Sequence, residues 1–319
     1  MRRGFWGPLQ ARRLADKWPK FGRWVLFWTA YTMHYMKNML TPIGVSDFTP
    51  EEAAHYTRVM GILTASFESL DYCLVRTGSV EYYDTLAHAL PEQLRAQSLK
   101  FFDAGGRTLV LRPDHTTAIA RLVASRMQTR PLPLRLYYTA PVFRSPLSSD
   151  APYLEHMQGG VELIGLSGAE ADTEILTLCA QGLEACGFHD FVFELGHRDF
   201  AVGYSGMQQQ QILEGDFAGL GFVPDMIPIA TLASDNPLYA VAQKLSPEIA
   251  AKTQVNMALM HGIEQYTGMI FRCYLSGMRF PIACGGRYDV LLSKFGYDQP
   301  AVGFAFDLAL LQRAMETRR

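Results

Sequence analysis

The sequence predicts an α+β fold in which a mostly antiparallel sheet is flanked by helices. Residues 135–144 and 159–164 are rich in aromatic and β-branched side chains and bracket a Pro/Ser/Asp loop at 145–152, which is typical of a long hairpin. No GxGxxG or Walker loop occurs, which argues against a parallel nucleotide-binding sheet. With 319 residues, 49% hydrophobic and 19% charged, the chain can bury one large core plus a small lobe.

The first elements follow from local patterns. Thr49-Pro50-Glu51-Glu52 is a capping box that begins a helix, and apolar residues at three- and four-residue steps extend it to about residue 70. A short strand is expected at 72–76 and another at 107–112. A helix is expected over 116–127.

The later elements are predicted in the same way. A helix over 169–186 carries acidic residues in its first turns, and 188–195 alternates as a strand. Residues 267–275 are predicted to be a strand, Gly285-Gly286 a turn, and the segment from about Gly303 to the C-terminus a helix.

The expected organisation has four parts. Residues 1–38 are an extension of unknown role, 39–198 and 259–319 form the two parts of the core, and 199–258 form a small, mostly helical insertion. For 1–38 three interpretations stay open: an extension or over-long start before Met39, an amphipathic surface segment, or a targeting sequence. The apolar stretch at 24–31 is shorter than the roughly 20 residues that span a bilayer.

Charge and cysteine content limit the partners. Residues 1–38 hold eight Lys/Arg and one Asp, so the other 281 residues hold 21 basic and 30 acidic side chains. A chain region with this excess of acidic side chains binds nucleic acid poorly. Five separated cysteines without a CxxC pair or metal-type spacing indicate reduced cytosolic thiols rather than a disulfide frame, and no metal site is expected. No membrane partner is expected either.

The hairpin carries the first candidate binding residues. Arg144 ends its first strand, and Gln158 and Glu162 share one face of the second. An arginine facing a carboxylate suits a ligand with both a carboxylate and an ammonium group. An ordinary cross-strand ion pair explains the same pattern.

Other candidates are equally ambiguous on their own. Asp114 and Thr116 lie at a strand-to-helix turn, where they are either ligand groups or a helix cap. Tyr266 and Tyr288 are either ligand groups or half-buried aromatic residues.

Taken in order, five segments resemble the histidyl-tRNA synthetase family, a class II aminoacyl-tRNA synthetase family, over residues 40–311. They are Arg112-Pro113-Asp114-His115-Thr116-Thr117-Ala118, Tyr137 to Arg144 with Gln158 to Glu162, His261 to Gly268, Cys284 to Asp289, and Ala301 to Ala305. The resemblance implies a class II sheet. It also implies that Asp114, Thr116, Gln158, Glu162, Tyr266 and Tyr288 hold an amino acid and that Arg144 serves its carboxylate.

The departures from that family concern its cationic groups. Leu310 stands at the third-motif arginine with Ala309 at the glutamate before it, His261 replaces the catalytic arginine, and the loop at 145–152 has no basic residue. Each lost arginine removes charge stabilisation that is worth several kcal/mol in this chemistry. We therefore expect a cation-poor cavity that does not activate ATP. Accordingly, no catalytic residue and no cofactor are expected.

Two further departures bear on the assembly. Gly78 replaces the first-motif proline at the family's dimer interface, which weakens the expectation of a homodimer without removing it. Little of the chain follows Ala305, so no anticodon-binding domain and no tRNA partner are expected.

With these departures, the sequence resembles the regulatory subunits of short-form ATP phosphoribosyltransferase. The resemblance implies a non-catalytic, cytoplasmic subunit that forms a hetero-oligomer with the short catalytic subunit, activates it in the first step of histidine biosynthesis and conveys inhibition by histidine. Whether the pocket senses histidine or is a vestige stays open. The alternatives are a histidine-binding adaptor for another partner, an active histidyl-tRNA synthetase-like enzyme, and a synthetase-like enzyme that modifies another substrate.

Overall fold

The computed structural model describes residues 41–145, 154–214, 216, 220, 226–259 and 264–317. The predictions for 1–38, for His261 and for most of the loop at 145–152 lie outside these residues. The chain divides into two units, Met1–Asp47 and Phe48–Arg319. In the first unit, the described residues contain a turn in which the Val45 N–H donates to the Pro42 carbonyl at 3.0 Å. The second unit contains all the helices and strands described for this protein.

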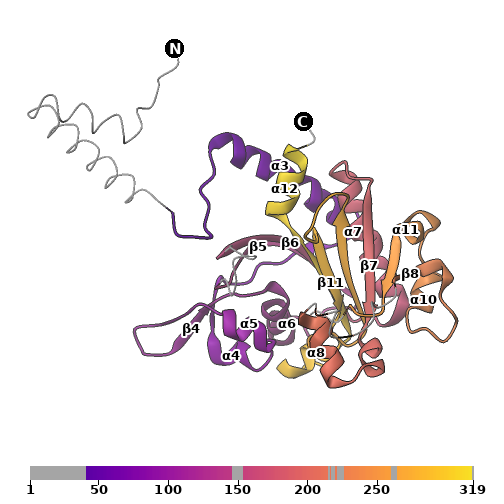
Figure 1. The fold of residues 1–319 in the computed structure, drawn as a ribbon. Coiled ribbons are helices and arrows are strands. Elements are labelled where there is room, and N and C mark those ends of the chain that lie inside the picture. Colours follow the sequence, from indigo (N-terminus) through magenta and orange to yellow (C-terminus); the bar gives the residue numbers. More distant parts are fainter. Residues whose placement is uncertain are drawn as a thin grey trace, which may run out of the picture. The chain divides into compact units, whose positions relative to one another are not determined.

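Within the described residues a nine-stranded sheet forms the centre of the fold (Figure 1). Its strands, in spatial order, are β1 (Cys73–Leu74), β5 (Leu134–Phe143), β6 (Glu155–Ile164), β12 (Ala301–Asp307), β11 (Ala283–Arg287), β10 (Met269–Leu275), β7 (Phe191–His197), β9 (Thr253–Asn256) and β8 (Met226–Pro228). Neighbours from β5 through β7 are antiparallel, whereas β1 with β5 and β7 with β9 are parallel. The α+β antiparallel sheet predicted from the sequence is confirmed.

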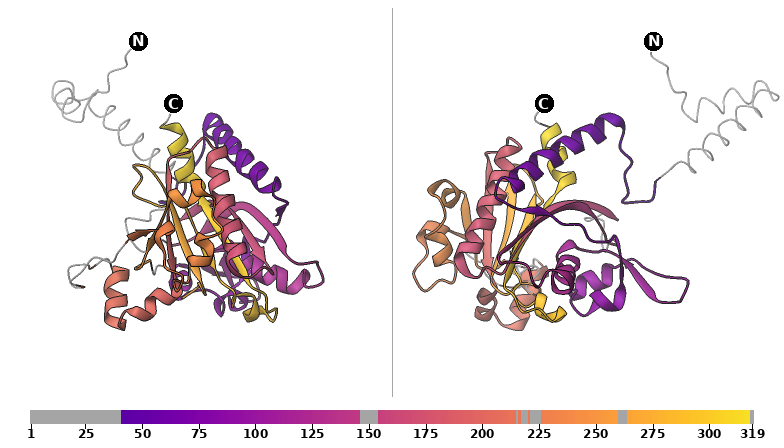
Figure 2. Two further views of the ribbon diagram at one scale, coloured as in Figure 1. Left: turned by 90° about the vertical axis from the view of Figure 1, so that its right-hand side faces the viewer. Right: turned by 180° about the vertical axis from the view of Figure 1, so that it is seen from behind.

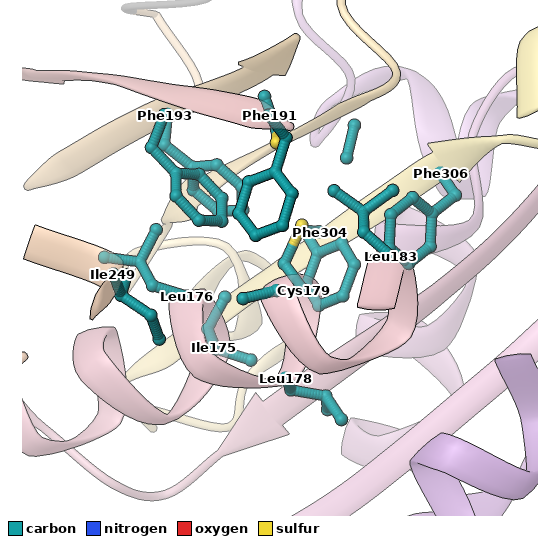
Figure 3. Close-up of a cluster of buried hydrophobic side chains, with 14 of the residues drawn as sticks. Ile175, Leu176, Leu178, Cys179, Leu183, Phe191, Phe193, Ile249, Phe304 and Phe306 are labelled. Atoms are coloured by element: carbon teal, nitrogen blue, oxygen red, sulfur yellow. The ribbon is translucent and has the colours of Figure 1, made fainter. Parts of the chain in front are cut away.

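Helices on one face bury the larger core. The face carries α3 (Pro50–Glu68), α7 (Gly168–Ala185) and α12 (Leu308–Glu316), whose apolar residues join those of the sheet in one buried cluster. Figure 3 shows side chains of α7, among them Cys179 and Leu183, next to aromatic rings of β7 and β12. Phe304 and Phe306 are nearly inaccessible, and burying such a side chain contributes about 1.5–3 kcal/mol.

A smaller layer covers the opposite face near β5 and β6. It contains α4 (Tyr83–Ala87), α5 (Glu92–Gln97), α6 (His115–Arg126) and a three-stranded sheet of β2 (Val80–Tyr82), β4 (Thr108–Leu111) and β3 (Lys100–Phe102). In Figures 1 and 2, β5 and β6 curve between this layer and α3. Apolar residues of α6 and β5 form a second buried cluster there.

Residues 199–258 are more closely tied to the sheet than their sequence indicated. They contain α8 (Gly206–Glu214), α10 (Tyr239–Ala242), α11 (Pro247–Ala251) and the turns η1 (Arg198–Gly203) and η2 (Ile229–Thr231). They also supply β8 and β9, which extend the main sheet beyond β7. Among the described residues, no helix is long and apolar enough to cross a membrane.

Two predictions near the C-terminus are wrong. Gly285 and Gly286 lie inside β11 rather than in a turn, and 301–307 is the strand β12 rather than the start of a helix. Strands buried on both faces lack the polar alternation by which a strand is recognised, and β12 reads as an apolar run. The final helix begins at Leu308, where the Asp307 side chain accepts from the Leu310 N–H and caps it.

The other predicted elements are present with shifted ends. The capping box of Thr49 and Glu52 is confirmed, with the Thr49 N–H donating to Glu52 at 2.8 Å. The strand expected at 72–76 is only the two-residue β1. The turn η3 (Leu292–Phe295) packs against α6 and closes the second buried cluster.

Candidate functional site

A cavity of about 870 Å³ opens on the face of the sheet away from α7. Six of the seven predicted residues line it: Asp114, Thr116, Arg144, Gln158, Tyr266 and Tyr288. The seventh, Glu162, is buried just below the lining and is 1% exposed. Tertiary folding therefore gathers residues from α6, β5, β6 and the β10–β11 region into one place.

Glu162 is a strongly perturbed carboxyl group of the site. Thr116 Oγ1 donates to Glu162 Oε1 at 2.7 Å, and the Tyr288 hydroxyl donates to Oε2. Burial raises the pKa of Glu162 to about 8 even though both hydroxyls oppose the shift. A neighbouring ammonium group would favour the ionised carboxylate, so the site is suited to a cationic ligand group.

Two glycines make room for these polar side chains. A Cβ at Gly303 on β12 would lie 2.0 Å from Glu162 Oε2, and a Cβ at Gly286 on β11 would lie 2.8 Å from the Tyr266 ring. Both contacts are shorter than any normal carbon contact. The floor of the cavity therefore requires glycine at Gly286, which the sequence suggested as a turn, and at Gly303, which it suggested as the start of a helix.

Asp114 is the N-cap of α6, as one of the two sequence interpretations held. Its Oδ1 accepts from the Thr117 N–H at 2.6 Å and its Oδ2 from the Thr117 hydroxyl at 2.9 Å. Burial raises its pKa, while the Thr117 hydrogen bonds and the charges of Arg144 and Arg112 lower it. The cap fixes the Asp114 carboxylate at the cavity wall. Asp114 therefore caps α6 and lines the cavity at the same time.

Arg144 does not form the cross-strand ion pair that the hairpin pattern allowed. Its Nε donates to the Pro113 carbonyl at 2.7 Å, and its backbone N–H pairs with Leu154 rather than with a residue opposite Glu162. Glu162 instead lies opposite Leu136 and Gly303. Within the described residues, the terminal nitrogens of Arg144 make no hydrogen bond, which leaves them for an anionic ligand group.

A buried ion pair positions Tyr288. Arg287 donates through Nη2 to Asp172 on α7 at 2.8 Å and through Nη1 to Asp289 at 3.0 Å. The Asp289 carboxylate in turn accepts from the Ala301 N–H at 3.0 Å. The Gly-Gly-Arg-Tyr-Asp segment therefore anchors β11 to α7 and β12 and aims Tyr288 at Glu162.

His115 is a site residue that the sequence reasoning did not select. It lines the cavity, stacks on Tyr138 with 4.1 Å between ring centroids, and its Nε2 lies 3.0 Å from the Ala140 carbonyl. Burial lowers its pKa to about 3, so the imidazole is neutral at physiological pH. The sequence signal that could have identified His115 is its position inside the Arg-Pro-Asp-His-Thr segment.

The expectation of a cation-poor cavity is wrong. Leu310 does line the cavity where the resemblance places an arginine, but Arg272 on β10, Arg279 after β10 and Arg313 on α12 line it too. The alternation of β10 puts Arg272 on the cavity side, and Arg313 follows Leu310 by three residues on the same helix face. The sequence motifs do not reveal Arg272 and Arg313, because these arginines stand at positions other than those of the family's missing arginines.

The fold and the cavity together define a class II synthetase-like domain with a large polar cavity. The family described as Histidyl-tRNA synthetase matches residues 44–209 and 229–311. An ATP phosphoribosyltransferase regulatory subunit from Symbiobacterium thermophilum is 33% identical, over 86% of this chain and 79% of its own length. One from Geobacter sulfurreducens is 29% identical, over 87% and 73%.

A solved structure agrees with these relatives. The ATP phosphoribosyltransferase regulatory subunit/histidyl-tRNA synthetase from Bacillus halodurans C superposes with a TM-score of 0.73 at 27% identity, over 87% of this chain and 83% of that one. The chain therefore belongs to the family of histidyl-tRNA synthetase-like proteins that includes the ATP phosphoribosyltransferase regulatory subunits.

Proposed function

We propose that this chain is a non-catalytic regulatory subunit that assembles with the short catalytic subunit of ATP phosphoribosyltransferase, activates it, and conveys inhibition by histidine. The names of the relatives support the regulatory role and the partner. The observation that carries the histidine part is the joint presence of Glu162, Asp114 and Arg144 at one cavity.

The chemistry of the cavity fits an amino-acid zwitterion. Glu162 and Asp114 provide carboxylates for an ammonium group, and Arg144 has free donors for a carboxylate. Gln158 and Tyr266 line the remaining wall and can hydrogen-bond an imidazole. A ligand that binds here regulates the partner only if it prefers one state of the assembly.

The test mixes the chain with a short-form catalytic subunit and measures phosphoribosyl-ATP formation with and without histidine. We expect activation by the chain and inhibition by histidine. Glu162→Gln should weaken histidine binding to the free chain in isothermal titration and reduce inhibition of the mixture. Glu155→Gln, on the same strand but outside the cavity, is the matched control.

The outcomes separate the two parts of the proposal. Without activation by the chain, the regulatory role is refuted. With activation but with inhibition unchanged in the Glu162 variant, the pocket is not the sensor and inhibition acts elsewhere. A class II homodimer inside the hetero-oligomer is expected from the fold, and the mass of the free chain in solution tests it.

The arginines of the cavity favour one alternative, a synthetase-like enzyme that uses a nucleotide. Histidine-dependent ATP–pyrophosphate exchange by the purified chain would establish it. We expect no exchange, because Leu310 leaves a hydrocarbon side chain where the third-motif arginine would stand.

A further inference from the structure

The Glu162 carboxyl group has no cationic partner in the part of the chain that the structure describes. It is 1% exposed, and none of the ion pairs formed there includes it. Asp172 on α7, which is 7% exposed, instead pairs with Arg287 at 2.8 Å. An ionised carboxylate is costly in a dry interior unless a cation neutralises it. A carboxyl group in the position of Glu162 therefore takes up a proton.

The hydrogen bonds of Glu162 suit both of its protonation states. Thr116 Oγ1 lies 2.7 Å from Oε1, and the Tyr288 hydroxyl contacts Oε2. Both hydroxyls donate to the ionised carboxylate. When the carboxyl group carries a proton, one hydroxyl can turn and accept a hydrogen bond from it, because a hydroxyl is both donor and acceptor. The proton can therefore enter or leave while all three side chains stay in place.

Neutral groups surround Glu162 on several sides. Among the described residues, four tyrosines lie near it: Tyr72, Tyr138, Tyr266 and Tyr288. Burial raises the pKa of each tyrosine and the negative charge of Glu162 adds to the shift, so their hydroxyls are neutral at physiological pH. His115, next to Thr116 on α6, is neutral as well. These groups therefore do not stabilise the ionised carboxylate by charge.

The charged groups on the neighbouring elements do not neutralise Glu162 either. Burial raises the pKa of Glu162, and the negative charge of Asp114 at the start of α6 raises it further. The charge of Arg144 acts on Asp114, whose pKa burial raises and this arginine lowers. On the strands beside β6, Glu162 faces Leu136 and Gly303, which carry no charge. The free pocket thus holds a protonated carboxyl group beside an acidic one.

We infer that a bound amino acid expels the proton of Glu162, so that the pocket holds its ligand more tightly as pH rises through neutrality. When the ammonium group of the ligand arrives, the O–H bond of the carboxyl group breaks and the proton leaves to solvent. The carboxylate then pairs with the ammonium group. One cation enters as one proton leaves, so the charge of the buried cluster stays balanced. The ligand occupies the pocket described above, and the inference therefore rests on the proposed function.

The size of the effect follows from the buried carboxyl group. With the pKa of Glu162 raised to about 8, about 0.9 of the chains hold this proton at pH 7. Binding at pH 7 should therefore release about 0.9 proton per histidine, and the dissociation constant should fall about fivefold from pH 7 to pH 8. By linkage, inhibition of the assembled enzyme by histidine should tighten by a similar factor.

The experiment is isothermal titration of the full chain with L-histidine at pH 7 in MOPS and in Tris. These buffers differ in their heat of ionisation, so the difference between the two binding heats counts the protons released. Glu155→Gln, on the same strand but outside the cavity, should release the same number as wild type. Glu162→Gln, titrated at higher concentration, should release none beyond what the ligand itself contributes.

A second ligand tests the cause of the release. The compound 3-(imidazol-4-yl)propionate is histidine without its ammonium group, so it should bind without expelling the proton of Glu162. Equal proton release by histidine and by this compound would overturn the inference, even if the Glu162 variant bound too weakly to titrate. Release that persists in Glu162→Gln would also overturn it, because the proton would then come from another group.

Two further outcomes separate this inference from the proposed function. Saturable binding of histidine with the same heat in both buffers would refute the proton release and leave the histidine pocket in place. No saturable binding of histidine would refute both.

Discussion

The contribution of Glu162 to the stability of this protein should fall as pH rises from about 5 to 8. The carboxyl group is 1% exposed and its pKa is raised from an ordinary 4.5 to about 8, with burial as the main cause. A carboxyl whose pKa is raised on folding stabilises the native state in its protonated form. That contribution is complete below the unfolded pKa and is lost as pH rises through the folded pKa.

The magnitude follows from the shift. Between the two pKa values the folded protein holds one proton that the unfolded chain has released, so stability falls by about 1.4 kcal/mol per pH unit. From pH 5 to pH 8 the loss is about 4 kcal/mol, a large part of a typical domain's 5–15 kcal/mol. Glu162 is fully buried, so screening by solvent does not reduce this value.

Glu162→Gln isolates this contribution. The amide has the size of the protonated carboxyl group and can accept from one of Thr116 and Tyr288 while donating to the other. It cannot ionise. We expect similar stability of variant and wild type near pH 5, and a variant more stable by about 4 kcal/mol near pH 8.

The assay is urea denaturation at several pH values, with the free energy of unfolding compared between the two proteins. The comparison cancels other titrating groups such as His115. Parallel stability curves for the two proteins across this range would refute the argument, because they would mean that Glu162 ionises in the folded protein as easily as in the unfolded chain.

Three further predictions concern packing, charge and helix capping. Gly303→Ala should destabilise by about 1–3 kcal/mol in urea denaturation, since the new methyl group would meet Glu162 and the Val161 carbonyl. The control Gly61→Ala lies in the exposed middle of α3, where a methyl group has nothing within 4 Å, and should stabilise by about 0.5–1 kcal/mol. A Gly303 variant as stable as wild type would show that the floor relaxes freely. Arg287→Gln should cost about 3–5 kcal/mol in thermal unfolding because it leaves Asp172 buried without its partner, and a shift in Tm below one degree would contradict this. Thr49→Ala should cost about 1 kcal/mol through loss of the capping box of α3, and an unchanged unfolding midpoint would mean that the helix end contributes nothing.

The sequence by itself determined the elements whose signals are local. The Thr49 capping box, the apolar stripe of α3, the aromatic strands of the hairpin and the cap of α6 depend on residues a few positions apart, so their patterns predict them. The site residues were also identified from the sequence, though only through resemblance, because each alone had an equally good structural explanation.

Only the tertiary structure decided what depends on strands meeting across the sheet. Gly286 and Gly303 look like turn and helix residues until neighbouring strands bring Tyr266 and Glu162 within contact of them. Arg272 became part of the cavity because β10 pairs with β11, which no local pattern reveals. Burial is likewise a property of the assembled fold, and it is burial that raises the pKa of Glu162.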